Sequence, residues 1–193
     1  MRRPGSRRRF KENPNNVSGQ ASSFLAMTAI KPGEVDALRD YLQGFRDRGE
    51  RPFDKVPGTH MARFVIVDKF NCKATYKQRH PETLACASLC FSSNLDGPID
   101  AYLDVLCDAL APEAQEIWGR CCGAPATCEG QALKRYLRRN QVNSGFFYAA
   151  YPNATVADVK RTLAQRDALI AFATKHQGVP ADQLQQAFVE EFA

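Results

Sequence analysis

The sequence has no run of about 18 or more apolar residues, the length that a membrane-spanning helix needs. No long apolar stretch follows the arginines near its start, as a secretory signal would require. The composition is otherwise that of a globular protein, with 44% hydrophobic and 24% charged residues in 193. We therefore expect a soluble, cytoplasmic protein built as a single domain with tails.

Paired metal-binding motifs are also missing. The seven cysteines are odd in number, which indicates reduced thiols and small core residues instead of a disulfide framework. Cys121, Cys122 and Cys128 lie close together, but adjacent cysteines fit poorly the spacing of a structural zinc site. The three histidines, His60, His80 and His176, are distant from this cluster in sequence, so no fourth ligand is specified and we expect no metal site.

The net charge of +5 belongs to the first residues of the chain. Six basic residues precede the first acidic one, Glu12, and the remaining 20 basic residues face 21 acidic ones. We expect residues 1–21 to form a disordered basic arm, because almost nothing apolar ties it to a core. A solubilising tail is the simpler interpretation, while targeting or nucleic-acid binding remains an alternative. The six basic residues are Arg2, Arg3, Arg7, Arg8, Arg9 and Lys11.

Hydrophobic periodicity predicts an α+β fold. Short apolar runs with polar flanks are typical of strands, whereas apolar residues repeating every three or four positions are typical of amphipathic helices. The expected strands are residues 22–30, 59–68, 84–92 and 144–151, and the expected helices are 34–46, 99–110, 130–139, a long one capped by Thr155, and a short one within 180–192.

This order is the β-α-β-β-α-β, ferredoxin-like arrangement, an antiparallel sheet with helices on one face and here an additional C-terminal helix. We expect the ferredoxin-like domain to comprise residues 22–175 and a helical tail to comprise residues 176–193. The third strand alternates: Ala85, Ala87, Leu89 and Phe91 form an apolar face, opposite a smaller and more polar one.

Three stretches, THMARFVIVD, LCFSSNLDGPIDAYLD and EIWGRCCG, resemble segments of uncharacterised bacterial members of the ferredoxin-like, dimeric α/β-barrel superfamily. The resemblance covers roughly residues 22–175 and implies a homodimer that pairs its sheets face to face. Members of the superfamily include small monooxygenases, ligand-sensing modules, and haem enzymes similar to dye-decolourising peroxidases and chlorite dismutases. The peroxidases carry a Gly-x-x-Asp-Gly phrase, whose nearest match here ends in Asp96-Gly97 and lacks the first glycine.

The resemblance makes His60, Arg63 and Asp96 the candidate catalytic residues. A haem would need a neutral imidazole as its axial ligand, for which His60 is the candidate, and Arg63 would meet a propionate or stabilise developing negative charge. Three residues of separation place His60 and Arg63 on opposite faces of a regular strand, so sharing a pocket requires a bulge or a strand end. The alternative is structural: a hydrogen-bonded histidine, an arginine paired with an acid, and an aspartate that caps a helix.

Cys86, Ser88 and Cys90 share the more polar face of the third strand and are candidate pocket residues, with inert buried cysteines as the alternative. The basic run Lys134, Arg135, Arg138 and Arg139 has the charge to contact phosphate, but no aromatic-glycine phrase typical of RNA binding accompanies it.

These observations predict a small-ligand-binding protein of the dimeric barrel type, either an oxidoreductase with a haem or substrate pocket, peroxidase-like or monooxygenase-like, or a non-catalytic homodimeric assembly module. Nucleic-acid binding through the arm is the third possibility.

Overall fold

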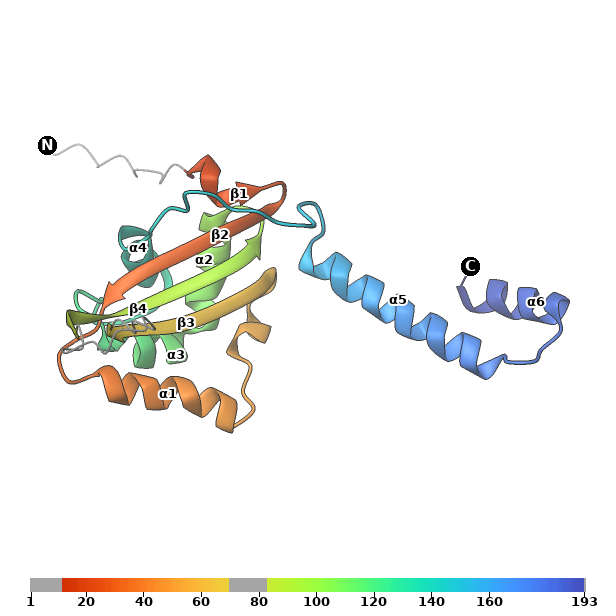
Figure 1. The fold of residues 1–193 in the computed structure, drawn as a ribbon, viewed down its shortest axis with the longest axis horizontal. Helices are drawn as coiled ribbons and strands as arrows, with labels where there is room; N and C mark the ends of the chain where they lie inside the picture. Colours follow the sequence, from red (N-terminus) through yellow and green to blue (C-terminus); the bar gives the residue numbers. More distant parts are fainter. Residues whose placement is uncertain (1–11, 70–82, 193) are drawn as a thin grey trace, which may run out of the picture. The chain divides into compact units, whose positions relative to one another are not determined.

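The computed structural model describes residues 12–69 and 83–192 (Figure 1). The chain divides into two compact units, Met1–Ala154 and Thr155–Ala193. Most of the predicted basic arm, and with it the basis for nucleic-acid binding, lies outside the described residues. From Pro14 onward the described chain is folded, beginning with the 3-10 helix Pro14–Asn16. Within the described ranges, no helix combines the length and apolar character needed to cross a bilayer.

The first unit contains an antiparallel sheet of four strands among the described residues. Its spatial order is β1-β2-β4-β3. Strand β4 therefore lies in the interior of the sheet, paired antiparallel with β2 on one side and with β3 on the other. The fold class is therefore α+β, as predicted, and is compatible with a ferredoxin-like layout. The strands are β1 Val17–Ser18, β2 Ala21–Ala29, β3 Thr59–Lys69 and β4 Thr83–Asp96.

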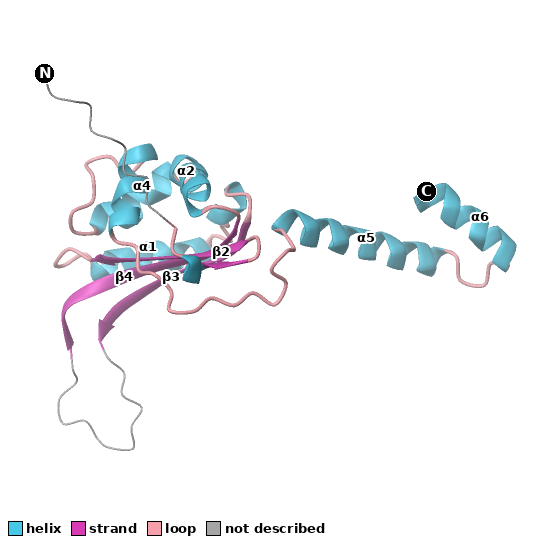
Figure 2. Ribbon diagram, turned by 90° about the horizontal axis from the view of Figure 1, so that it is seen from above, coloured by secondary structure: helices cyan, strands magenta, loops and turns pink. Residues whose placement is uncertain are grey.

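Among the described residues of this unit, no helix covers the second face of the sheet (Figure 2). Helices α2 and α4 lie together on one side of the sheet (Figure 2). Helix α1 follows β2 and packs near β3 and α3. The bounds are α1 Val35–Asp47, α2 Ile99–Ala109, α3 Ala111–Ile117 and α4 Gly130–Arg139, with 3-10 helices at Pro52–Lys55 and Trp118–Arg120.

The core lies between the sheet and these helices. Leu89, Phe91 and Leu95 alternate along β4 and are fully buried, because every second side chain of a strand faces the same way. Trp118 packs edge-on against Phe91 and Phe64, with ring centroids 5.4 and 5.7 Å away. The apolar face predicted for the third strand is thus confirmed at Leu89 and Phe91, whereas Ala85 is exposed.

The strand predicted at residues 144–151 is wrong: this segment is irregular. The chain pairs with β2 only briefly, where Val142 N–H donates to the Leu25 carbonyl and Met27 N–H donates to the Asn140 carbonyl. Further along, the edge of β2 is already paired with β1 at Ser22 and Ala21. Since a sheet edge offers one row of backbone groups, no second strand forms there.

The second unit is a pair of helices, α5 Val156–Lys175 and α6 Ala181–Phe192. The predicted cap is confirmed: the Thr155 hydroxyl accepts from the Asp158 N–H, while the Asp158 carboxylate accepts from the Thr155 N–H. Phe172 of α5 packs edge-on against Phe188 and Phe192 of α6, and these three rings join the two helices.

We expect the first turn of α5 to lose stability in acid. Hydrogen bonds from the Thr155 hydroxyl and N–H lower the pKa of Asp158 below its ordinary value of 3.8. A lowered pKa in the folded state means that the carboxylate stabilises the fold above its unfolded pKa and ceases to do so as the pH falls through the folded pKa. The hydrogen-exchange protection factors of the amides at residues 155–158, which are corrected for the intrinsic pH dependence of exchange, should therefore fall at low pH, and Asp158→Asn should remove that part of the pH dependence.

Candidate functional site

The face of the sheet turned away from α2 and α4 is the candidate site (Figure 2). Hydrogen-bond register places Leu25, Ser92 and Arg63 side by side across the three long strands. The outward positions are Ser23, Leu25, Met27 and Ala29 of β2; Ser88, Cys90, Ser92 and Asn94 of β4; and Met61, Arg63, Val65 and Val67 of β3. Of these positions only Arg63 is charged.

A hollow of about 230 Å³ lies at one end of this face. It is lined by Ser23, Leu25, Met61, Arg63, Ser92, Asn94 and Ser144. Ser144 comes from the irregular segment after α4 and is held there by its N–H, which donates to the Asn16 side chain at 2.8 Å. Three strands and one loop therefore form the walls of the hollow, and both polar and apolar side chains line it.

Arg63 supplies the only charge among the described residues that line the hollow. Its Nε–H donates to the Ser92 hydroxyl at 3.2 Å, and within the described part of the chain it forms no ion pair. The acid partner considered from sequence is therefore not found among these residues. A guanidinium so placed keeps most of its N–H donors available for a carboxylate or phosphate.

A β-bulge at His60 places its side chain on the same side of the sheet as that of Arg63. Thr59 lies opposite Leu95 and Met61 opposite Asn94, so His60 is the extra residue of β3. Thr59 faces inward, where its hydroxyl lies 3.1 Å from that of Tyr102. A bulge, which the sequence analysis named as one way for His60 and Arg63 to share a pocket, is present, but only Arg63 lines the hollow.

His60 forms a pair with Asp96 at the end of the face. Nε2 of His60 lies 2.7 Å from Oδ1 of Asp96. Because an ionised carboxylate only accepts hydrogen bonds, Nε2 is the donor of this contact when Asp96 is ionised. Both side chains are partly buried. The structure thus brings together His60 and Asp96, while Arg63 lies further along β3 and is the one that lines the hollow.

The predicted pocket residues Ser88 and Cys90 lie on the outward face, but neither lines the hollow. Cys90 lies between Met27 and Val65 in the adjoining apolar row. Burial raises the pKa of the Cys90 thiol, which favours its protonated form over the nucleophilic thiolate. Cys86 is exposed near the opposite end of the face, with its sulfur 3.7 Å from the Ile30 carbonyl oxygen.

Cys121, Cys122 and Cys128 form a cluster that lies outside this face. Cys121 and Cys128 are buried and Cys122 is exposed. The Cys121 sulfur lies 3.4 Å from the Thr28 hydroxyl. In residues 12–69 and 83–192, no group of three or more His, Cys, Asp or Glu side chains is arranged to hold a metal ion.

The residues of this face do not fit a haem within one chain. His60, the candidate axial ligand, is not among the residues lining the hollow, and its Nε2 is already bonded to Asp96. The hollow of about 230 Å³ is also smaller than the ~300–1,000 Å³ typical of small-molecule pockets. We expect that adding hemin produces no sharp Soret band dependent on His60, and absorption spectra of the wild type and His60→Ala would test this.

Sequence reasoning missed the part played by Leu25, Met27 and Ser144. The first two alternate with buried Phe24 and Ala26 along β2, and that alternation was the available signal. No comparable signal in the sequence pointed to Ser144, because its position depends on how the loop after α4 returns to β2.

Comparison of the chain with protein-family models, with curated proteins and with solved structures found no match.

Proposed function

We propose that this protein binds a small anionic organic ligand on the outward face of its sheet, and that a second copy of the chain covers that face. The observation that carries the proposal is the character of the face: a largely uncharged, partly apolar surface with Arg63 at its hollow. The ferredoxin-like, dimeric α/β-barrel type fits this arrangement.

The outward face differs from the solvent-exposed face of a typical antiparallel sheet. An antiparallel sheet with one solvated face normally carries polar residues there. Here Met27 and Val65 flank Cys90 in one row, and Leu25 lies in the next. Two sheets that pack face to face lie about 10 Å apart, so a second copy would bury these residues and enclose space for a ligand.

The segment after α4 supports an interface at the same edge. Phe146, Tyr148 and Tyr151 are strongly exposed, Phe146 to 82%. The segment is fixed near both ends, at Ser144 by Asn16 and at Pro152, whose carbonyl accepts from the Gln20 N–H. Exposed aromatic side chains on a held backbone are typical of protein interfaces, where tyrosine and phenylalanine are enriched.

The hollow favours a ligand with a carboxylate. Arg63 supplies the positive charge, and the Ser92 and Asn94 side chains supply neutral hydrogen-bonding groups beside it. Leu25 and Met61 line the same hollow and suit the apolar part of the ligand. If the site is catalytic, the His60–Asp96 pair is the candidate for proton transfer, with Nδ1 of His60 as the base.

Binding can be tested with benzoate as the probe, followed through the amide chemical shifts of the ¹⁵N-labelled protein. We expect shifts centred on Leu25, Arg63 and Ser92, and weaker effects from neutral benzamide. Arg63→Gln should lower the benzoate affinity about tenfold or more, because a hydrogen bond to a charged group contributes about 1.5–3 kcal/mol.

Arg46→Gln is the matched control, since it removes the same charge from an exposed position on α1. Equal benzoate affinity in wild type and Arg63→Gln, or shifts confined to other elements, would refute the ligand site.

The second candidate function is a non-catalytic homodimeric assembly module. The small volume of the hollow in one chain favours it, because contact between two sheets would then fill most of the face. A dimer whose amide shifts do not respond to benzoate would support this function over ligand binding.

A further inference from the structure

Helix α4 carries four basic residues in two pairs, each pair four positions apart. Lys134 and Arg138 form one pair, and Arg135 and Arg139 form the other. Residues four apart lie on the same side of a helix, so each pair has its own surroundings.

The first pair serves the fold. Lys134 Nζ lies 2.7 Å from the Asp104 carboxylate, and an Arg138 terminal nitrogen lies 2.8 Å from the Asp100 carboxylate. Both acids belong to α2, so these ion pairs join α4 to its neighbour. The charges of Lys134 and Arg138 are thereby offset within the unit.

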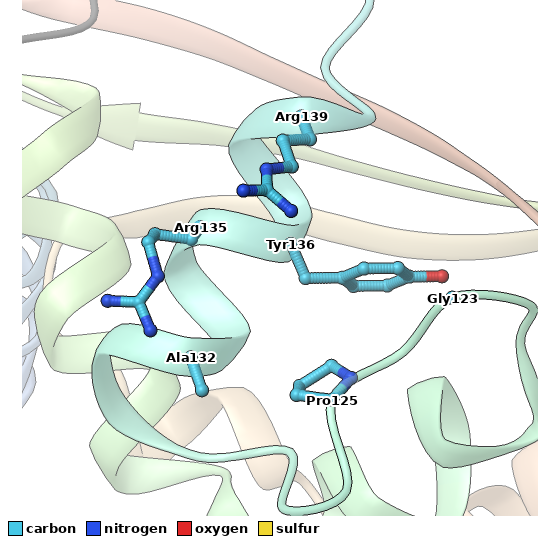
Figure 3. A pocket seen from close by; sticks show the side chains of 6 residues that line it. All are labelled: Gly123, Pro125, Ala132, Arg135, Tyr136 and Arg139. Carbon is cyan, nitrogen blue, oxygen red and sulfur yellow. The ribbon is translucent and has the colours of Figure 1, made fainter. Parts of the chain in front are cut away.

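The second pair is exposed and lies beside a hollow of about 310 Å³. Within the described part of the chain, neither Arg135 nor Arg139 has an ion pair or hydrogen bond through its side chain. The hollow is lined by Gly123, Pro125, Ala132, Arg135, Tyr136 and Arg139, without an acidic residue (Figure 3).

The wall opposite the helix is a loop held in place by α4 itself. Tyr136 extends from α4 toward Gly123, with Pro125 nearby (Figure 3). The Tyr136 hydroxyl donates to the Cys122 carbonyl at 2.9 Å. Gly123 has φ +69°, a backbone conformation that favours glycine, and it continues the loop past this contact. The hollow is therefore bounded by parts that are fixed to each other.

We propose that this hollow binds a small phosphate monoester, with the phosphoryl group between Arg135 and Arg139 and the organic part against Pro125 and Ala132. Two like charges four residues apart on a helix repel each other, and a dianion bound between them removes that repulsion. Guanidinium groups bind phosphate oxygens in pairs. Because Lys134 and Arg138 are already neutralised, the basic surface is limited to two residues, which suits one phosphoryl group better than a nucleic acid.

Isothermal titration calorimetry with phenyl phosphate and with inorganic phosphate tests this site. We expect phenyl phosphate to bind more tightly than inorganic phosphate, because its ring contacts the apolar lining. Added salt should weaken both, since the contact is electrostatic. The double variant Arg135→Gln/Arg139→Gln should lose at least tenfold in affinity for phenyl phosphate.

Arg46→Gln is again the control for loss of one exposed positive charge, and circular dichroism checks that α4 remains folded in the double variant. Unchanged phenyl phosphate affinity in a folded double variant would overturn the proposal. So would the absence of binding of either probe by the wild type at millimolar concentration. The site is distinct from the Arg63 hollow, so benzoate binding and phenyl phosphate binding should be lost in different variants.

Discussion

Replacing Trp118 with alanine should lower the free energy of unfolding by about 3–5 kcal/mol, the range for large core aromatic residues changed to alanine. Trp118 is fully buried, and its ring meets Phe91 and Phe64 edge-on. Phe53 stacks on Phe91 at 5.9 Å, so the cavity would open in the middle of an aromatic cluster that supports the sheet from the helix side.

Trp118→Phe is the matched variant. It keeps most of the apolar area and removes an indole N–H that is buried without a hydrogen-bond acceptor among the described residues. We therefore expect a loss of about 1 kcal/mol or less. Urea unfolding followed by circular dichroism measures both variants, since Trp118 is the only tryptophan and fluorescence is lost with it. Equal losses in the two variants would contradict this account of the core.

Replacing Asp100 with alanine should lower the free energy of unfolding by about 2–4 kcal/mol, because it leaves the Arg138 guanidinium without its carboxylate. The Arg138 side chain is only 2% exposed, while Asp100 is 38% exposed. The Gln141 side chain still accepts a hydrogen bond from Arg138 at 2.6 Å, which limits the loss.

Asp104→Ala is the control: Asp104 is more exposed and its partner is Lys134, so we expect a loss below about 1 kcal/mol. The double variant Asp100→Ala/Arg138→Leu should recover part of the stability, because it removes the buried charge as well as its partner. If Asp100→Ala and Asp104→Ala were equally mild in urea unfolding, the ion pair at Arg138 would not hold α4 to α2.

Local patterns predicted most of the elements of this fold. Residues 130–139 were expected to be helical and form α4, and residues 99–110 were expected where α2 spans Ile99–Ala109. The cap at Thr155 was also predicted, and it forms both of its hydrogen bonds with Asp158. Apolar periodicity and capping residues act over a few neighbouring positions, so a single sequence displays them.

Long-range pairing was not predictable in the same way. The segment 144–151 is rich in aromatic residues that favour strands, yet β1 occupies part of the edge that it would have used. The bulge at His60 depends on the register of β3 against β4, which local sequence does not specify. The sequence named Arg63, His60 and Asp96 as candidates, and of these only Arg63 lines the hollow. The grouping of Arg63 with Leu25, Met61 and Ser144 required the structure.

The central claim is that the outward face of the sheet is covered by a second copy of the chain. Light scattering coupled to size-exclusion chromatography tests it most directly, with Val65→Glu on that face and Val105→Glu on α2 as a pair matched in exposure, 43% and 42%. We predict that the wild type and Val105→Glu have twice the chain mass of 21.5 kDa, and that Val65→Glu has the mass of one chain. A wild type of 21.5 kDa, or a Val65→Glu variant that remains dimeric, would contradict the account.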